Sequence, residues 1–188
     1  MRKDLGAIPA VYPMTVLMIA SYAENGTVDV MNAAWGTICG MDKIALCIGG
    51  HKTNANIEKT KAFTVALADA AHLKEADFFG IASAGKMADK FERTGMTATK
   101  SERVNAPIIE EFPVTMECEL LEDVRTDSLH MVVGKIVNVT ADEKVLDEKG
   151  NVDVEKLDAI IFDQFGRSYF TTGEKLAGAW NAGMELMK

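Results

Sequence analysis

Cysteine is scarce in this sequence, and its spacing excludes several kinds of site. Cys39, Cys47 and Cys118 are odd in number and far apart, and neither a C-x-x-C pair nor a histidine cluster accompanies them. Disulfide frameworks, zinc sites and iron–sulfur sites need paired or closely spaced cysteines. We therefore expect no metal site, and we interpret Cys47 and Cys118, which lie in apolar runs, as small core residues.

Long apolar runs and an excess of positive charge are also lacking. The longest apolar stretch surrounds Val16–Ala20, far short of the roughly 20 residues that a membrane-spanning helix needs. Met1–Gly6 is not followed by the apolar stretch of a signal peptide. The net charge of -8 disfavours nucleic acids and anionic membranes, because both bind basic surfaces. We expect a cytoplasmic protein that binds neither nucleic acid nor membrane.

The sequence does contain a pattern of short strands in a chain of single-domain size. With 188 residues, 48% hydrophobic and 26% charged, residues 1–188 are expected to form one domain. The Asn25-Gly26 pair predicts a hairpin between strands at 14–21 and 28–35. Apolar runs and period-two alternation predict further strands at 44–48, 63–67, 114–120, 130–139 and 168–171.

Short helices are predicted between these strands. Apolar spacing and capping residues place them at 54–61, 71–81, 87–93 and 155–159, with a C-terminal helix after Gly173. The elements do not alternate as in a Rossmann fold, and the chain has neither G-x-G-x-x-G nor a P-loop. We expect a mainly β protein, a small antiparallel barrel with short helices inserted between its strands.

A polar segment, Gly49–Asn56, lies between a predicted buried strand and the start of a helix. Its glycines let the backbone approach a ligand, and a helix N-terminus offers unpaired N–H groups and a positive dipole end. Lys52 adds positive charge with His51, while Thr53 and Asn56 add hydrogen-bonding side chains. These are the components of a phosphate site. The alternative is a glycine-containing loop followed by an ordinary threonine N-cap.

A second segment, Asn32–Cys39, changes from strand-like residues to small and polar ones. Its small side chains would admit a planar ring, and Asn32 and Thr37 would bond the polar edge of that ring. Trp35 would form one wall. The alternative is a β-bulge at the end of a hairpin, with Trp35 in the core.

Five motifs, taken in their order along the chain, resemble the flavin reductase-like family, which includes the flavoredoxins and the NAD(P)H:FMN oxidoreductases. They are MNAAWGT, HKTNANIEKTKAFTV, SAGKMADKFERTG, DSLHMVVGKIVNV and YFTTGEKLAGAW. The resemblance implies a six-stranded antiparallel split β-barrel with Greek-key topology. It also implies a homodimer that holds FMN without a covalent bond near the dimer interface.

The resemblance further implies a set of site residues. On the ring side of FMN these are Asn32, Ala33, Ala34, Trp35, Thr37 and Cys39. On the phosphate and ribityl side they are His51, Lys52, Thr53 and Asn56, with Ser83 and Lys90 contributed by a further segment. His130 aligns with a histidine near the nicotinamide site of reductases and is the candidate catalytic residue.

Three functions follow as expectations. The first is an NADH- or NADPH-dependent flavin oxidoreductase, in which hydride passes to N5 of the flavin and the cofactor carries the chemistry. The second is a flavoredoxin-type electron-transfer protein with tightly bound FMN and a protein redox partner. The third is a non-enzymatic split barrel that binds another ligand, since fold alone does not determine function.

Overall fold

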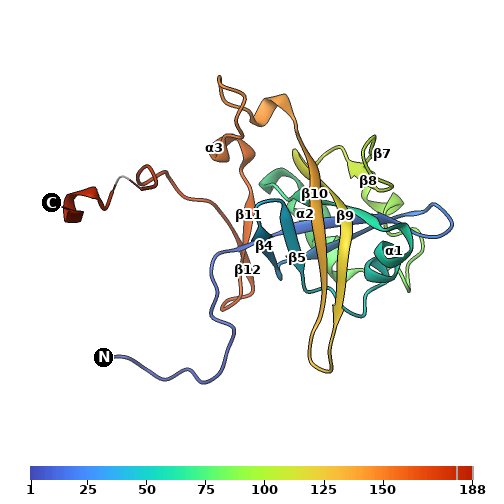
Figure 1. Ribbon diagram of the computed structural model, residues 1–188, viewed down its shortest axis with the longest axis horizontal. Helices are drawn as coiled ribbons and strands as arrows, with labels where there is room; N and C mark the ends of the chain where they lie inside the picture. Colours follow the sequence, from blue (N-terminus) through green and yellow to red (C-terminus); the bar gives the residue numbers. More distant parts are fainter. Residues whose placement is uncertain (181, 188) are drawn as a thin grey trace.

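Seven antiparallel strands form the main sheet within residues 1–180 and 182–187, the part of the chain that the computed structural model describes (Figure 1). Their order across the sheet is β3 (Val28–Ala33), β2 (Leu17–Tyr22), β6 (Ala62–Leu67), β9 (Val114–Arg125), β10 (His130–Ala141), β5 (Lys43–Leu46) and β4 (Gly36–Gly40). The predicted hairpin around Asn25-Gly26 is confirmed, because β2 pairs with β3 across that turn.

The sheet curls into a split barrel because its two edge strands are consecutive in the sequence. β3 ends at Ala33 and β4 begins at Gly36, so at most about 11 Å of extended chain separates the two edges. These strands do not pair with each other in the described sheet, and Ala34 and Trp35 cross the split between them. The predicted split barrel is confirmed, with seven strands in its sheet where six were expected.

Smaller elements cover the barrel. β1 (Met14–Thr15), β11 (Ile160–Asp163) and β12 (Ser168–Thr171) form a second sheet, and β7 (Ala98–Lys100) pairs with β8 (Pro107–Ile109). The α-helices are α1 (Lys52–Thr60), α2 (Leu73–Ile81) and α3 (Val154–Leu157). Short 3-10 turns occur at η1 (Ala70–His72), η2 (Glu92–Thr94), η3 (Glu143–Val145) and η4 (Met184–Met187).

Strand β2 is buried on both faces, which gives the protein two adjoining cores. Its residues Leu17 and Ile19 point into the barrel and pack with Phe63 and other inward side chains. Met18, on the other face, packs with Phe79 of α2. This explains why the sequence of β2 is a continuous apolar run, since apolar and polar residues do not alternate in a strand that is covered on both faces.

Two predicted helices, at 87–93 and after Gly173, are wrong, since only short 3-10 turns occur in the part of these segments that the structure describes. Residues 87–93 form successive turns that end in η2, because so short a segment gains few helical hydrogen bonds to offset nucleation. Among the residues described after Gly173, helical structure is confined to the turn η4. Gly173, Gly178 and Gly183 disfavour a helix in this stretch, and its large apolar side chains do not pack on the barrel.

Both ends of the chain extend from the same side of the barrel (Figure 1). Residues 1–13 precede β1 without regular structure, and residues after Thr171 leave β12 in the same direction. No helix in the described part of the chain is long and apolar enough to cross a bilayer.

Candidate functional site

A cavity of about 360 Å³ opens at the split of the barrel. The end of β3, the start of α1, the end of α2 and the loop after α2 form its walls. Most of the site residues expected from the sequence line it: Asn32, Ala33, Ala34, Trp35, His51, Lys52, Thr53, Ser83 and Lys90. Segments that are far apart in the sequence therefore converge on one space. Thr37, Cys39 and Asn56 do not line this cavity.

The N-terminus of α1 forms one end of the cavity. Its N-cap, His51, makes no side-chain capping bond, and the first turn carries no acidic residue. The first N–H groups of the helix, its positive dipole end and the exposed Lys52 together favour an anion at this position. Gly50 adopts a φ of +79°, which lets the chain turn sharply into the helix.

A buried carboxylate, Asp29 of β3, stands behind this helix end and also lines the cavity. Its Oδ2 accepts hydrogen bonds from Thr53 Oγ1 at 2.8 Å and from Asn56 Nδ2 at 3.1 Å. Asn56 lies behind the wall, where its amide also reaches Ser21 Oγ at 3.4 Å. Asn56 therefore positions Asp29, and the expected direct contact between Asn56 and a ligand is not supported.

Lys90 brings a buried positive charge to the same cavity. Only 4% of the residue is exposed, although a lysine in a surface turn is usually solvated. Its Nζ donates to the carbonyl of Phe79 at 3.1 Å and lies 5.7 Å from the centre of the Phe79 ring. Burial lowers the pKa of Lys90 from its usual range, and the charge of Asp29 partly opposes this shift.

Two hydrogen bonds hold the ring-side segment, Asn32–Cys39, where it crosses the split of the barrel. Asn32 Nδ2 donates to the carbonyl of Ala76 in α2 at 2.9 Å, and Cys47 N donates to the carbonyl of Trp35 at 2.8 Å. The Trp35 side chain is half exposed. The alternative that placed Trp35 in the core is therefore wrong.

A second cavity, of about 330 Å³, shares Ala34, Trp35 and Cys47 with the first. Thr37 lines this second cavity, whereas Cys39 is exposed further along β4 and lines neither. Cys118 is buried as expected, but Cys47 is exposed and its assignment to the core is wrong. The apolar run ends at Leu46, so Cys47 already lies on the cavity wall.

His130, the candidate catalytic residue, lines neither cavity. Its Nε2 lies 2.8 Å from Asp123 Oδ1, and it packs so closely against Gly49 that an added Cβ there would stand 2.3 Å from His130 Cβ. The guanidinium of Arg125 bonds both Asp123 and Glu58. His130, Asp123 and Glu58 have ligand atoms within 4.8 Å of one another. Because Arg125 already supplies the positive charge, we interpret this cluster as an ion-pair network.

The chain matches the family model described as the flavin reductase like domain over residues 10–170. It belongs to that family. The match extends from the N-terminal segment to β12, and it includes every strand of the barrel.

Several solved structures have a backbone fold similar to that of this flavin reductase-like domain over almost the whole chain. The flavoredoxin of Desulfovibrio vulgaris (Miyazaki F) is 34% identical, with a TM-score of 0.92 over 97% of this chain and 100% of that one. The flavoredoxin of Methanosarcina acetivorans is 21% identical, with a TM-score of 0.87 over 100% and 98% of the two chains. The 2-nitrobenzoate 2-nitroreductase NbaA of Pseudomonas fluorescens is 21% identical, with a TM-score of 0.80 over 92% and 87%.

Sequence reasoning missed Asp29 in this flavin reductase-like domain. A signal was present, because aspartate is depleted in strands and Asp29 stands between Val28 and Val30. An acidic residue within a predicted strand therefore needed a buried partner or a ligand. Phe79 was also missed, and only the fold brings its carbonyl and ring to Lys90.

Proposed function

We propose that this protein is a redox flavoprotein that binds FMN in the cavity at the barrel split. The observation that carries the proposal is the arrangement of that cavity, with an anion-favouring helix end at one side and small residues at the other. The N-terminus of α1 and Lys52 would hold the phosphate, while Ala33 and Ala34 leave room for the isoalloxazine ring. Asp29 Oδ1, a buried acceptor atom with no partner in the part of the chain that the structure describes, adds a place for a ligand donor.

The protein's own residues would bind and orient the cofactor and exclude water from part of it. FMN supplies the redox chemistry by accepting and giving electrons. Lys90 would place positive charge beside the bound cofactor, and Trp35 would shield part of the ring. No catalytic acid or base is required of the chain by this function.

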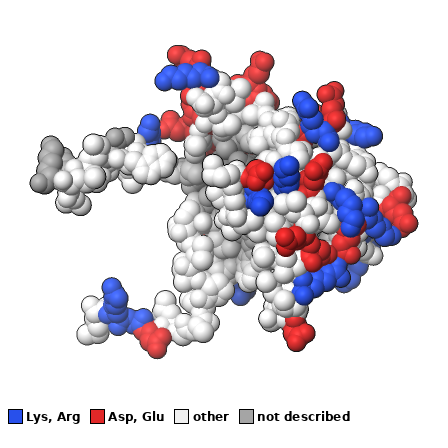
Figure 2. Space-filling view, in the orientation of Figure 1, with Lys and Arg blue, Asp and Glu red and all other residues white. Residues whose placement is uncertain are grey.

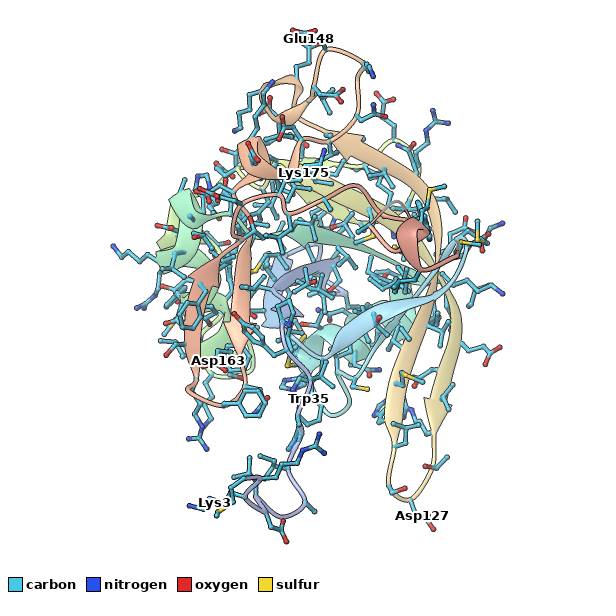
Figure 3. All side chains as sticks on the ribbon, turned by 90° about the vertical axis from the view of Figure 1, so that its left-hand side faces the viewer. Lys3, Trp35, Asp127, Glu148, Asp163 and Lys175 are labelled. Atoms are coloured by element: carbon cyan, nitrogen blue, oxygen red, sulfur yellow. The ribbon has the colours of Figure 1, made fainter. Side chains whose placement is uncertain are left out.

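A protein redox partner is the electron source that the comparisons support best. The relative from Desulfovibrio vulgaris is named a flavoredoxin, and 34% identity over nearly all of both chains supports a similar role here. An exposed Trp35 at the cavity mouth is consistent with a partner approaching the cofactor from that side (Figure 3).

NADH or NADPH is the second candidate electron source, which would make the protein an NAD(P)H:FMN oxidoreductase. The second cavity favours it, since this space adjoins the first across Ala34, Trp35 and Cys47 and offers room for a nicotinamide. His130 does not line that space, so this candidate function does not depend on the histidine.

The three free cysteines are compatible with a cytoplasmic location.

A homodimer is the assembly that we propose, because several large apolar side chains of the barrel and of the C-terminal segment are exposed. Trp35, Ile38 and Phe165 are more than half exposed, as are Leu176 and Trp180 of the C-terminal segment. Charged side chains are sparse on the side of the barrel from which both terminal segments extend (Figure 2). Large apolar side chains left exposed in this way favour an interface with a second copy. Analytical ultracentrifugation tests the proposal, and a monomeric protein at micromolar concentration would exclude it.

The absorbance spectrum of the purified protein and an FMN titration test the cofactor. A bound flavin spectrum, or saturable quenching of FMN fluorescence, is expected. A colourless protein that takes up no FMN would leave only the non-enzymatic split barrel.

Anaerobic reduction then separates the two electron sources. Rapid bleaching of the bound flavin by NADH or NADPH alone would establish the oxidoreductase. Bleaching by a reduced ferredoxin-type protein, with neither nucleotide effective, would establish the electron carrier.

A further inference from the structure

Two buried groups of opposite charge line the cavity without contacting each other. Asp29 is 3% exposed and Lys90 is 4% exposed. The described residues include no ion pair between them. The carboxylate bonds Thr53 and Asn56 through Oδ2, while the ammonium donates to the carbonyl of Phe79.

Both groups keep hydrogen-bonding capacity that the described protein atoms do not use. Asp29 Oδ1 is buried and has no hydrogen-bond partner among the described residues. An ammonium has three N–H donors, and one hydrogen bond of Lys90 Nζ is found in the described structure. Buried charges are normally fully bonded, because a missing partner leaves the desolvation of the group uncompensated. The unused acceptor and donors are therefore available to a partner that both donates and accepts hydrogen bonds.

The place of Asp29 indicates which part of a ligand it meets. Through Thr53 it is bonded to the first turn of α1, on the phosphate side of the cavity. Along β3 it precedes Asn32, which begins the ring-side segment. Asp29 thus stands between the two sides, where the chain that joins a flavin ring to its phosphate would run.

A phosphate alone does not satisfy this pair. It would accept from Lys90, but a phosphate dianion has no proton for Asp29 Oδ1 and is repelled by the carboxylate. A hydroxyl group both donates and accepts, so it can bond both residues.

We propose that Asp29 and Lys90 recognise the hydroxyl groups of the ribityl chain, with one hydroxyl donating to Asp29 Oδ1 and Lys90 donating to a hydroxyl oxygen of the same chain. The proposal rests on the proposed function, that the cavity binds FMN. Asp29 is then a specificity residue that selects flavins with a hydroxylated chain. This role also explains why a phosphate site on an acidic protein contains a buried carboxylate.

The test compares two ligands that differ only in the hydroxyl groups. One is FMN, and the other is its analogue in which a phosphopentyl chain without hydroxyls replaces ribityl phosphate. Dissociation constants are measured by flavin fluorescence for the wild type, for Asp29→Asn and for Asp127→Asn. Asp127 lies at the tip of the β9–β10 hairpin (Figure 3) and lines neither cavity, and its substitution removes the same charge.

The wild type is expected to bind FMN about 10- to 100-fold more tightly than the analogue, because hydrogen bonds to charged groups are lost. Asp29→Asn should reduce this preference, mainly by weakening FMN binding. Its affinity for the analogue should be unchanged or higher, since a charge that repels the phosphate is gone. Asp127→Asn should retain the preference.

Equal affinity of the wild type for both ligands would overturn the proposal, and this comparison needs no variant. An equal loss for both ligands in Asp29→Asn would also overturn it, because the carboxylate would then only position Thr53 and Asn56. If the wild type binds neither flavin, the proposed function itself fails.

Discussion

Thr53 Oγ1 donates a hydrogen bond of 2.8 Å to Asp29 Oδ2, and this bond joins the first turn of α1 to β3. The helix end that favours an anion is thereby fixed to the strand that leads into the ring-side segment. Because this Thr53 hydroxyl proton is directed at Asp29, it is not free for a phosphate oxygen. The exposed Lys52 and the backbone N–H groups of α1 remain as donors on that side.

Lys52→Ala is therefore expected to weaken FMN binding about tenfold, because a charge-assisted contact to phosphate is lost. Riboflavin has no phosphate, so its affinity should not change. Fluorescence titrations of both flavins check this. Lys59→Ala, at the other end of α1, is the matched control. Equal losses for FMN and riboflavin would show that the phosphate lies elsewhere.

Lys90→Met should weaken FMN binding by about tenfold as well, because it removes a buried donor to the ligand. It should also change the pH dependence of stability. The pKa of Lys90 is lowered by burial, with Asp29 opposing the shift, whereas unfolded lysine has a pKa of about 10.4. Between these two pKa values the unfolded state binds more protons, so this residue makes stability rise with pH.

Urea unfolding at several pH values measures that contribution. The stability of the wild type relative to Lys90→Met should increase as the pH rises from the lowered pKa of folded Lys90 towards about 10. Lys86→Met, which replaces an exposed lysine of the same loop, should not show this trend. A pH-independent difference for Lys90→Met would contradict the expectation.

Asp77→Asn is expected to lower the pKa of Tyr169. Burial and the Asp77 carboxylate raise this pKa to about 12, and the Tyr169 hydroxyl donates to Asp77 Oδ1 at 3.0 Å. Without the negative charge the pKa should fall towards its ordinary value of about 10 while staying above it, since burial remains. Phenolate absorbance against pH, with Tyr169→Phe subtracted, gives the value.

The sign of the stability effect follows from the raised pKa. The folded state keeps the phenol proton longer than the unfolded state, so this stabilisation is present below pH about 10 and is lost towards pH about 12. A Tyr169 titration that is the same in wild type and Asp77→Asn would show that burial alone raises the pKa.

Gly134→Ala should destabilise the barrel by about 1–3 kcal/mol, because overpacking forces side chains out of place. A Cβ at Gly134 would lie 2.4 Å from Phe63 Cζ, and Phe63 is fully buried in the barrel core. Urea unfolding measures the loss. Gly173→Ala is the control, since a Cβ there meets no atom within 4 Å. Equal stability of the two variants would contradict this account of the core.

Much of the barrel could be predicted from the sequence because the signals for its strands are local. Asn25-Gly26 needs only its own backbone preference to form a turn, and β9 begins with an alternation that is visible within eight residues. The edge strand β4 was harder to predict. Its glycines and exposed side chains are not typical of a strand, and pairing with β5 decides its conformation.

The candidate site also contains residues that local sequence signals predict and residues whose positions depend on the tertiary structure. His51, Lys52 and Thr53 stand at a helix start that the sequence itself indicates, and they do line the cavity. The position of His130 could not be predicted, because Asp123, Arg125 and Gly49 reach it only through the pairing of β9 with β10 and the packing of the loop before α1.

The sequence by itself determined that Gly49–Asn56 has the components of a phosphate site and that Asn32–Cys39 has small residues suited to a ring. Only the tertiary structure decided that Asp29 and Lys90 are buried beside them. Burial depends on the segments that pack around a residue. Here β3, α1, α2 and the loop that follows α2 are brought together by the curl of the sheet.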